Sequence, residues 1–215
     1  NSYYEPVTIS PVTNQNLHGI NNVNLVVISP PIFLEQANRI AKIHETVDGL
    51  ATSVVTPQMI YNEFSSGSQD IAAIRDFMKM LRDKDAFGDD HAYLMLFGDG
   101  SFDYKDRIPG NTNFVPTYQS NESMKETASF VTDDFFGLLD ENEGSNSVGN
   151  LDVGIGRLPV ATVEEATNTV DKIEYYMSRN AEVTGSWRNT FCFIADDMDV
   201  NLHLDQANSL IDIAD

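Results

Sequence analysis

Residues 93–104 read Tyr-Leu-Met-Leu-Phe-Gly-Asp-Gly-Ser-Phe-Asp-Tyr, and this stretch decides the fold. Its first five residues form an unbroken apolar run that ends abruptly in Gly-Asp-Gly. A short apolar run closed by turn residues is typical of a strand buried on both faces, as in a parallel sheet covered by helices. In open α/β sheets the carboxyl ends of the central strands border the ligand crevice. We therefore expect polar function to gather around Gly98–Asp103.

Periodic segments on both sides of this strand predict an α/β fold. Strands and helices alternate along the chain, which is typical of a three-layer sandwich with a mostly parallel sheet and helices on both faces. Thr162 and Glu165 have the spacing of a capping box at the start of one helix. Strands are predicted at 23–29, 53–56, 151–159 and 190–195, and a short strand or hairpin edge is predicted within 130–139. Helices are predicted at 33–50, 70–83, 162–179 and 202–215, and irregular segments at 61–70 and 106–129. Side chains predicted to be nearly buried are Val26, Ile28, Leu94, Leu96 and Ile155.

The composition excludes some classes of partner. The chain has 215 residues and a net charge of -20, from 33 acidic and 13 basic residues. So large an acidic excess argues against nucleic acid, because few cations could neutralise a row of phosphates. It also disfavours an anionic membrane surface, and no apolar run is long enough to span a bilayer. Two interpretations of the charge stay open: a solvated, self-repelling surface, or carboxylates that bind Ca²⁺ outside the cytoplasm.

Three aspartates are the candidate calcium ligands. Asp99 and Asp103 follow the central strand, and Asp133 lies in the long excursion after it. Calcium takes several carboxylate and carbonyl oxygens, although the full EF-hand spacing is absent here. The alternative is an Asp-rich turn in which the side chains bond to local backbone amides. No other cofactor is required by any motif.

Nothing in the chain forms a recognisable nucleophile–base pair. Cys192 is the single cysteine and lies between two phenylalanines in a predicted strand, so we expect a buried, inert thiol. The four histidines show no metal-binding spacing such as His-Glu-x-x-His. Gly98–Ser101 is neither a phosphate loop nor a nucleophile elbow. We assign no catalytic residue within these 215 positions.

Six segments resemble the gingipain-type cysteine peptidases. One is Leu-Phe-Gly-Asp-Gly-Ser-Phe-Asp-Tyr-Lys at 96–105, and another is Gly-Ile-Gly-Arg-Leu-Pro-Val at 154–160. The other four lie at 61–67, 73–81, 113–118 and 132–140, so the resemblance covers about residues 61–215. It implies a caspase-like fold and a catalytic Cys–His dyad.

The resemblance also implies a domain organisation. Residues 23–185 would be the first gingipain-like subdomain and 186–215 the start of a truncated second subdomain, while the polar, Asn-rich composition of residues 1–22 predicts an extended lead-in. In the family the histidine sits in a Gly-His-Gly setting after one strand, and the cysteine follows the next strand. Neither setting occurs in this chain. The dyad is therefore expected beyond residue 215, and the chain by itself is predicted to be inactive.

The resemblance is strongest to the sortase-like members of the type IX secretion system of Bacteroidetes. It implies polypeptide substrates with C-terminal sorting domains, other secretion components as partners, and an extracytoplasmic place at the cell surface or outer membrane. Asp196 or Asp197 falls where the family carries an acid near the dyad. His203, with Asp205 beside it, falls where gingipains carry the acid that selects a basic P1 side chain. That difference argues against carrying over a preference for Arg or Lys.

The rival hypothesis is a non-catalytic caspase-like module that only binds partners or Ca²⁺. Its sequence would share the same strands and helices. A Gly-His-Gly and a later cysteine at a strand end, downstream of Asp215, would favour the enzyme.

Overall fold

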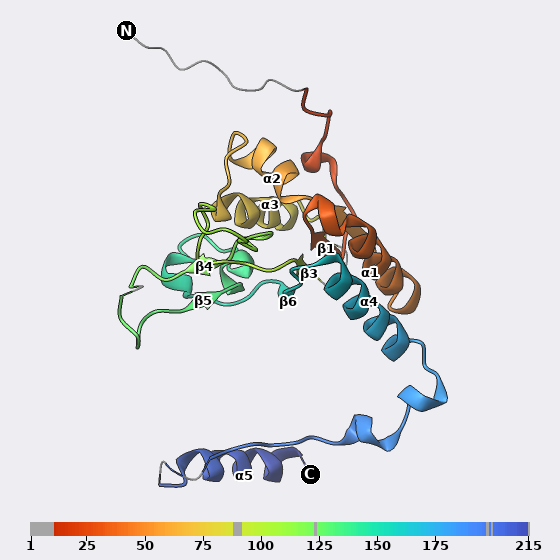
Figure 1. The fold of residues 1–215 in the computed structure, drawn as a ribbon, viewed down its shortest axis with the longest axis vertical. Helices are drawn as coiled ribbons and strands as arrows, with labels where there is room; N and C mark the ends of the chain where they lie inside the picture. The colour runs from red at the N-terminus through yellow and green to blue at the C-terminus, as the bar shows by residue number, and fades with distance from the viewer. Residues whose placement is uncertain (1–10, 88–91, 123, 197, 199, 215) are drawn as a thin grey trace. The chain divides into compact units, whose positions relative to one another are not determined.

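The computed structural model describes residues 11–87, 92–122, 124–196, 198 and 200–214. Contacts divide the chain into two compact units, Asn1–Glu174 and Tyr175–Asp215 (Figure 1). The first unit holds the sheet and its two helical layers.

A four-stranded parallel sheet forms the middle of the first unit. Its order is β2 (Thr52–Val55), β1 (Leu25–Ile28), β3 (Tyr93–Phe97) and β6 (Gly154–Leu158). The three neighbouring pairs are all parallel, as the alternation of strands and helices predicts. β3 pairs on both sides, so the stretch that opened the sequence analysis is an interior strand.

The two faces of β3 bury alternate side chains. Leu94 and Leu96 lie in one core and Phe97 in the other. Burial of Val26, Ile28, Leu94 and Leu96 is confirmed, since each is at most 1% exposed. Burial of Ile155 is wrong, because this side chain is only partly buried. It lies on β6, which pairs with β3 alone in the described sheet and so is covered from fewer directions.

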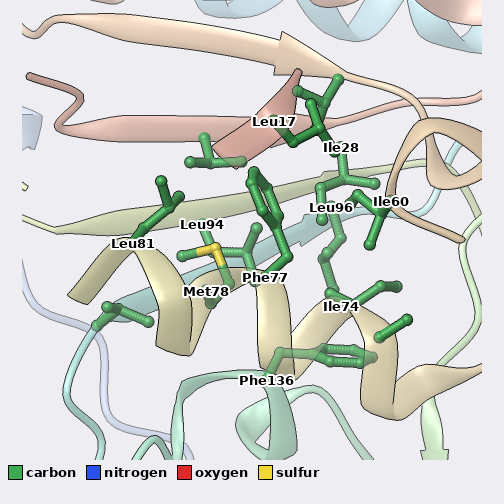
Figure 2. Packing of buried hydrophobic residues seen from close by; sticks show 14 of the residues in the cluster. Leu17, Ile28, Ile60, Ile74, Phe77, Met78, Leu81, Leu94, Leu96 and Phe136 are labelled. Carbon is green, nitrogen blue, oxygen red and sulfur yellow. The ribbon is translucent and has the colours of Figure 1, made fainter. Parts of the chain in front are cut away.

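One helical layer consists of α2 (Pro57–Phe64), α3 (Ile71–Asp83) and the 3₁₀ turn η3 (Asp134–Gly137). Figure 2 shows α3 side chains pointing toward the sheet residues Leu94 and Leu96. The apolar face of α3 is buried: Ile74, Phe77, Met78 and Leu81 are fully covered. Asp70 caps this helix by accepting a hydrogen bond from the amide of Ala72 at 2.8 Å.

The opposite face is covered by α1 (Leu34–Val47) and α4 (Val163–Met177), which completes the three-layer sandwich (Figure 1). Ala166 and Val170 of α4 join the core that contains Phe97. The capping box is confirmed: the Glu165 amide donates to Thr162 Oγ1, and the Glu165 carboxylate accepts from the Thr162 amide. The short 3₁₀ turns η1 (Leu17–Gly19) and η2 (Pro31–Phe33) lead into this framework.

The prediction of an irregular segment at 61–70 is wrong for its first residues, because α2 occupies Pro57–Phe64. Thr56 caps this helix by accepting from the Met59 amide, and Pro57 is its first residue. Proline is favoured at that position, since its fixed φ suits a helix and its missing N–H would have had no partner. Pro57 therefore starts a helix as well as ending a strand.

Three basic side chains of α3 hold the segment after η3. Arg75 donates to the carbonyl oxygen of Leu138, and both Lys79 and Arg82 donate to that of Leu139. The Arg75 contact measures 2.6 Å and the Arg82 contact 2.7 Å. The polar side of the helix thus fixes a loop through main-chain oxygens.

The long excursion after β3 contains a small hairpin. β4 (Tyr118–Gln119) pairs antiparallel with β5 (Val131–Thr132). The predicted strand at 130–139 is therefore only two residues long and is followed by η3. A further 3₁₀ turn, η4 (Ser145–Ser147), lies before β6.

The second unit contains η5 (Ala181–Val183), η6 (Ser186–Asn189) and α5 (Leu202–Ala214). The C-terminal helix is confirmed. The predicted strand at 190–195 is wrong in this structure, which assigns no strand to these residues. A strand needs a neighbour for its main-chain hydrogen bonds, and the described part of this unit offers no second strand. Cys192 is accordingly exposed rather than buried.

Glu63 of α2 ties the N-terminal segment to the sandwich. Its Oε1 accepts hydrogen bonds from Gln15 Nε2 and the Leu17 amide, both at 2.8 Å, and its Oε2 lies 2.6 Å from His18 Nδ1. Burial of the carboxyl group raises its pKa, but the hydrogen bonds outweigh this and hold the pKa of Glu63 at about 2. The carboxylate form is therefore the one that the fold stabilises.

The low pKa of Glu63 predicts a pH dependence of stability. The ordinary value is 4.5, so the contribution is present above about pH 4.5 and disappears as the pH falls toward 2. We expect Glu63→Gln to lower the free energy of unfolding at pH 7 by on the order of 1–3 kcal/mol. When the pH is lowered from roughly 6 to roughly 3, the free energy of unfolding measured by urea titration should fall less for the variant than for the parent. Glu164→Gln, on exposed α4 surface, controls for the substitution itself; equal slopes for parent and Glu63→Gln would contradict the assignment.

Candidate functional site

The carboxyl end of β3 is built around Gly98 and Asp99. Gly98 has φ +148°, and a Cβ there would lie 3.0 Å from the Cβ of Phe114, so the chain passes too close for a side chain. The Asp99 carbonyl oxygen accepts from the amides of Phe114 and Val115, and its carboxylate accepts from Thr112 Oγ1 at 2.5 Å. Asp99 therefore folds residues 112–115 back onto the strand end.

Asp103 closes the turn that follows. Its Oδ2 accepts from the amides of Arg107 at 2.5 Å and Ile108 at 2.7 Å, and its own amide donates to Ser101 Oγ. The residue is 8% exposed. These contacts match the alternative reading of an Asp-rich turn, in which the carboxylate satisfies local backbone amides.

Arg157 of β6 connects this edge to Asp133. Its Nε and Nη2 donate to the two carboxylate oxygens of Asp133, both at 2.7 Å. Its Nη1 donates to the carbonyl oxygens of Gly98 and Val115 at 2.8 Å, and Nη2 also donates to that of Pro116 at 3.2 Å. A guanidinium has five N–H donors, and here five acceptors surround it. One side chain thus joins β3, the segment before β4 and the segment after β5.

The three predicted calcium ligands are not gathered into one cluster. Each of Asp99, Asp103 and Asp133 already accepts hydrogen bonds from protein groups. Among the residues that the structure describes, no three His, Cys, Asp or Glu side chains are grouped so that they could hold a metal ion. Calcium at this edge would have to replace protein donors, so the calcium hypothesis stays a prediction.

Thermal melting tests calcium binding directly. If Ca²⁺ binds Asp99, Asp103 and Asp133 in the native state, millimolar Ca²⁺ is expected to raise the melting temperature by linkage. An equal concentration of Mg²⁺ is the control, because its smaller octahedral shell suits this loop geometry less well. Coincident melting curves in calcium and in chelator would contradict the hypothesis.

Three of the four predicted substrate-binding residues can be placed, all in the second unit. Asp196 Oδ1 and His203 Nδ1 are 4.0 Å apart, at the limit of an ion pair, and both side chains are largely exposed. They line a groove of about 400 Å³ together with Gln206 and Leu210 of α5. Asp205 lies in the first turn of α5 and its amide donates to the Asn201 carbonyl oxygen. Asp197 lies outside the described residues.

Sequence reasoning missed the role of Arg157. Its partner Asp133 is 24 positions away, so no local motif contains both residues. One signal was available: an arginine in the middle of a predicted strand is rarely buried unless it is paired. That signal does not indicate which carboxylate pairs with Arg157.

The chain belongs to peptidase family C25, whose family model matches residues 19–214. Members of this family are cysteine peptidases. Among solved structures, the chain is similar to dimeric latent PorU from Porphyromonas gingivalis, with 34% identity and a TM-score of 0.69. That match covers 90% of this chain but only 19% of the PorU chain. The fold class implied by the resemblance, a gingipain-like α/β sandwich, is confirmed.

Two further solved structures, the first of them also from Porphyromonas gingivalis, are similar to the chain. The complex of RgpB pro- and mature domains has 21% identity and a TM-score of 0.47, over 71% of this chain and 29% of that one. The Arg-specific gingipain R has 19% identity and a TM-score of 0.45, over 80% of this chain and 30% of that one. No curated protein matches the chain. None of the helices that the structure describes has the length and apolarity to span a bilayer.

Removal of Arg157 should be costly because its partner would remain. Arg157 and Asp133 are 13% and 21% exposed, and Arg157→Met leaves the Asp133 carboxylate largely buried without its donors. We expect a loss of about 3 kcal/mol in the free energy of unfolding. Arg39→Met is the matched control: Arg39 pairs with Asp171 and Glu174, both more than half exposed, so the loss should be below about 1 kcal/mol. Similar urea midpoints for the two variants would show that the Arg157 network contributes no more to stability than the exposed ion pairs of Arg39.

Proposed function

We propose that this chain is part of a cysteine endopeptidase with sortase-like transpeptidase activity, which processes the C-terminal sorting domains of cargo in type IX secretion. The observation that carries the proposal is its 34% identity to PorU over 90% of the chain, together with the family match over 19–214. The chain spans about a fifth of the PorU chain, so the activity belongs to a longer protein. Its other partners would be components of the same secretion machinery, at the outer surface of the cell.

The proposed chemistry is nucleophilic. A thiolate attacks the scissile carbonyl carbon to form an acyl-enzyme, and an imidazole first takes the thiol proton and then gives it to the leaving amine. An amine on the surface anchor, instead of water, would then accept the acyl group. In this proposal both catalytic side chains lie after residue 215, as the family resemblance implies. Cys192 is not assigned as the nucleophile, because the family motif does not match it.

His203 and Asp205 are the proposed determinants of P1 preference. His203 stands where the resemblance expects an acid, and its imidazole has Asp196 within 4.0 Å. An imidazole cannot form the fork-shaped carboxylate contact that favours arginine. A preference for uncharged P1 residues follows, and His203→Asp should shift it toward basic ones.

The full-length protein tests the proposal. We expect it to cleave a cargo polypeptide that carries a C-terminal sorting domain, and to yield an amide-linked product when glycine amide is supplied as acceptor. Alkylation of thiols should abolish both reactions, whereas Cys192→Ala should keep the parental rate. The 215-residue chain alone should hydrolyse no peptide, although its exposed Cys192 should react with iodoacetamide in the native state.

Two outcomes would overturn the assignment. Loss of activity in a folded Cys192→Ala protein would place the nucleophile at Cys192. A full-length protein that binds cargo but leaves it intact, with its downstream histidine and cysteine present, would favour the non-catalytic module. Mass spectrometry of the cargo termini distinguishes hydrolysis, transpeptidation and mere binding.

A further inference from the structure

The hairpin β4–β5 leaves one edge of β4 open. Tyr118 pairs with Thr132 and Gln119 with Val131, and the Ser120 amide donates to the Phe130 carbonyl oxygen at 3.0 Å. Main-chain groups alternate between the two sides of an antiparallel strand, so if Ser120 faces β5, Gln119 faces away from it. Within the described residues no hydrogen bond reaches the amide or carbonyl group of Gln119. This edge is a template for another strand.

The open edge borders a hollow of about 260 Å³. Gln119 lines it from β4 and Thr117 from the position just before β4. Gln69 and Asp70 line it from the residues just before α3, and Tyr104 lines it from the loop after β3. In Figure 1, β4 lies on the α3 side of the hairpin. An added strand would therefore place its alternate side chains against this hollow.

A second hollow, of about 270 Å³, shares Gln69 and Tyr104 with the first. Asp106, Asn111 and Asn113 complete its polar lining. Gln69 Nε2 donates to the Tyr104 carbonyl oxygen at 2.9 Å, which fixes the boundary between the two hollows. Together they offer space beside the edge for more than one side chain.

The charge of these walls selects the side chains. Asp70 lines the first hollow and Asp106 the second, and neither lining includes a lysine or arginine. The chain as a whole carries a charge of -20. A basic side chain is therefore electrostatically favoured there, and an acidic one is repelled.

The edge is held in place before any ligand arrives. Arg157 binds the carbonyl oxygens of Val115 and Pro116, just before β4, and Gln119 Nε2 donates to the Ser101 carbonyl oxygen at 3.3 Å. A preformed edge loses less conformational freedom on binding than a mobile loop would.

We propose that the outer edge of β4 binds an extended polypeptide segment as an added strand, with a basic side chain of that segment beside Asp70. This site lies within the first unit and uses none of the residues assigned to P1 preference. It goes beyond the proposed function, because strand addition needs neither the dyad nor turnover.

Two proline variants test the proposal on the 215-residue chain. Gln119→Pro removes the outward N–H of β4 and also the side-chain hydrogen bond to Ser101, so Gln119→Ala, which keeps the N–H, controls for the side chain and should bind like the parent. Val131→Pro removes the N–H of the partner position, which faces the opposite edge of the hairpin. Neither N–H is used between the two strands, so both variants should keep the hairpin, as circular dichroism and thermal melting can check. The probe is the fluorescein-labelled peptide Thr-Val-Lys-Val-Thr-Val, followed by fluorescence anisotropy.

We expect the parent and Val131→Pro to bind the probe with equal affinity, and Gln119→Pro to bind it at least about tenfold more weakly. Replacing the probe lysine with glutamate should weaken binding to the parent, and so should Asp70→Asn, which keeps a side-chain oxygen for the α3 cap. Equal binding by parent and Gln119→Pro, or no binding by the parent, would overturn the proposal. Two results would show that this site is separate from the proposed catalytic function. One is binding of the probe without its turnover, and the other is a full-length Gln119→Pro protein with the peptidase activity of the parent.

Discussion

The guanidinium of Arg157 is the contact on which the carboxyl edge of the sheet depends. A charged group that is 13% exposed loses hydration, so its position is favourable only if its donors are satisfied. All five are, by two carboxylate and three carbonyl oxygens. Lysine could not replace it, because an ammonium has three donors and no planar fork. Three segments from distant parts of the chain are thereby fixed relative to β6.

Much of the first unit was predictable because its local signals agree with its packing. The apolar run at 93–97 had the length and composition of an interior strand, and Asp70 and Thr162 supplied ordinary helix starts. The start of α2 was missed because Thr56-Pro57 carries two meanings. The dipeptide stops a strand, and it also provides a cap and a first helical residue.

The location of the site could be predicted from the sequence, but the hydrogen-bond partners of its residues could not. Asp99 and Asp103 lie at the end of the central strand, where topology puts polar residues. Their roles as acceptors for local amides depend on the path of residues 106–115, which no periodic pattern specifies. The strand expected around Cys192 is a second case in which local sequence does not specify the tertiary neighbours. Its apolar residues suit a strand, but pairing is a property of neighbours, and the described part of the second unit supplies none.

The basic residues of α3 act on main-chain oxygens, and this has a consequence for how the protein can vary. Arg75, Lys79 and Arg82 bind the carbonyl groups of Leu138 and Leu139, which every amino acid possesses. The anchoring of Leu138 and Leu139 therefore imposes a requirement on the helix and almost none on the polarity of these two residues, whereas Asp140 beside them also pairs with Arg82 through its carboxylate. Substitutions at positions 138 and 139 are thus constrained by packing, since both side chains are buried. The residues that determine how the loop is held are three basic side chains on α3, in a chain that has only 13 lysines and arginines.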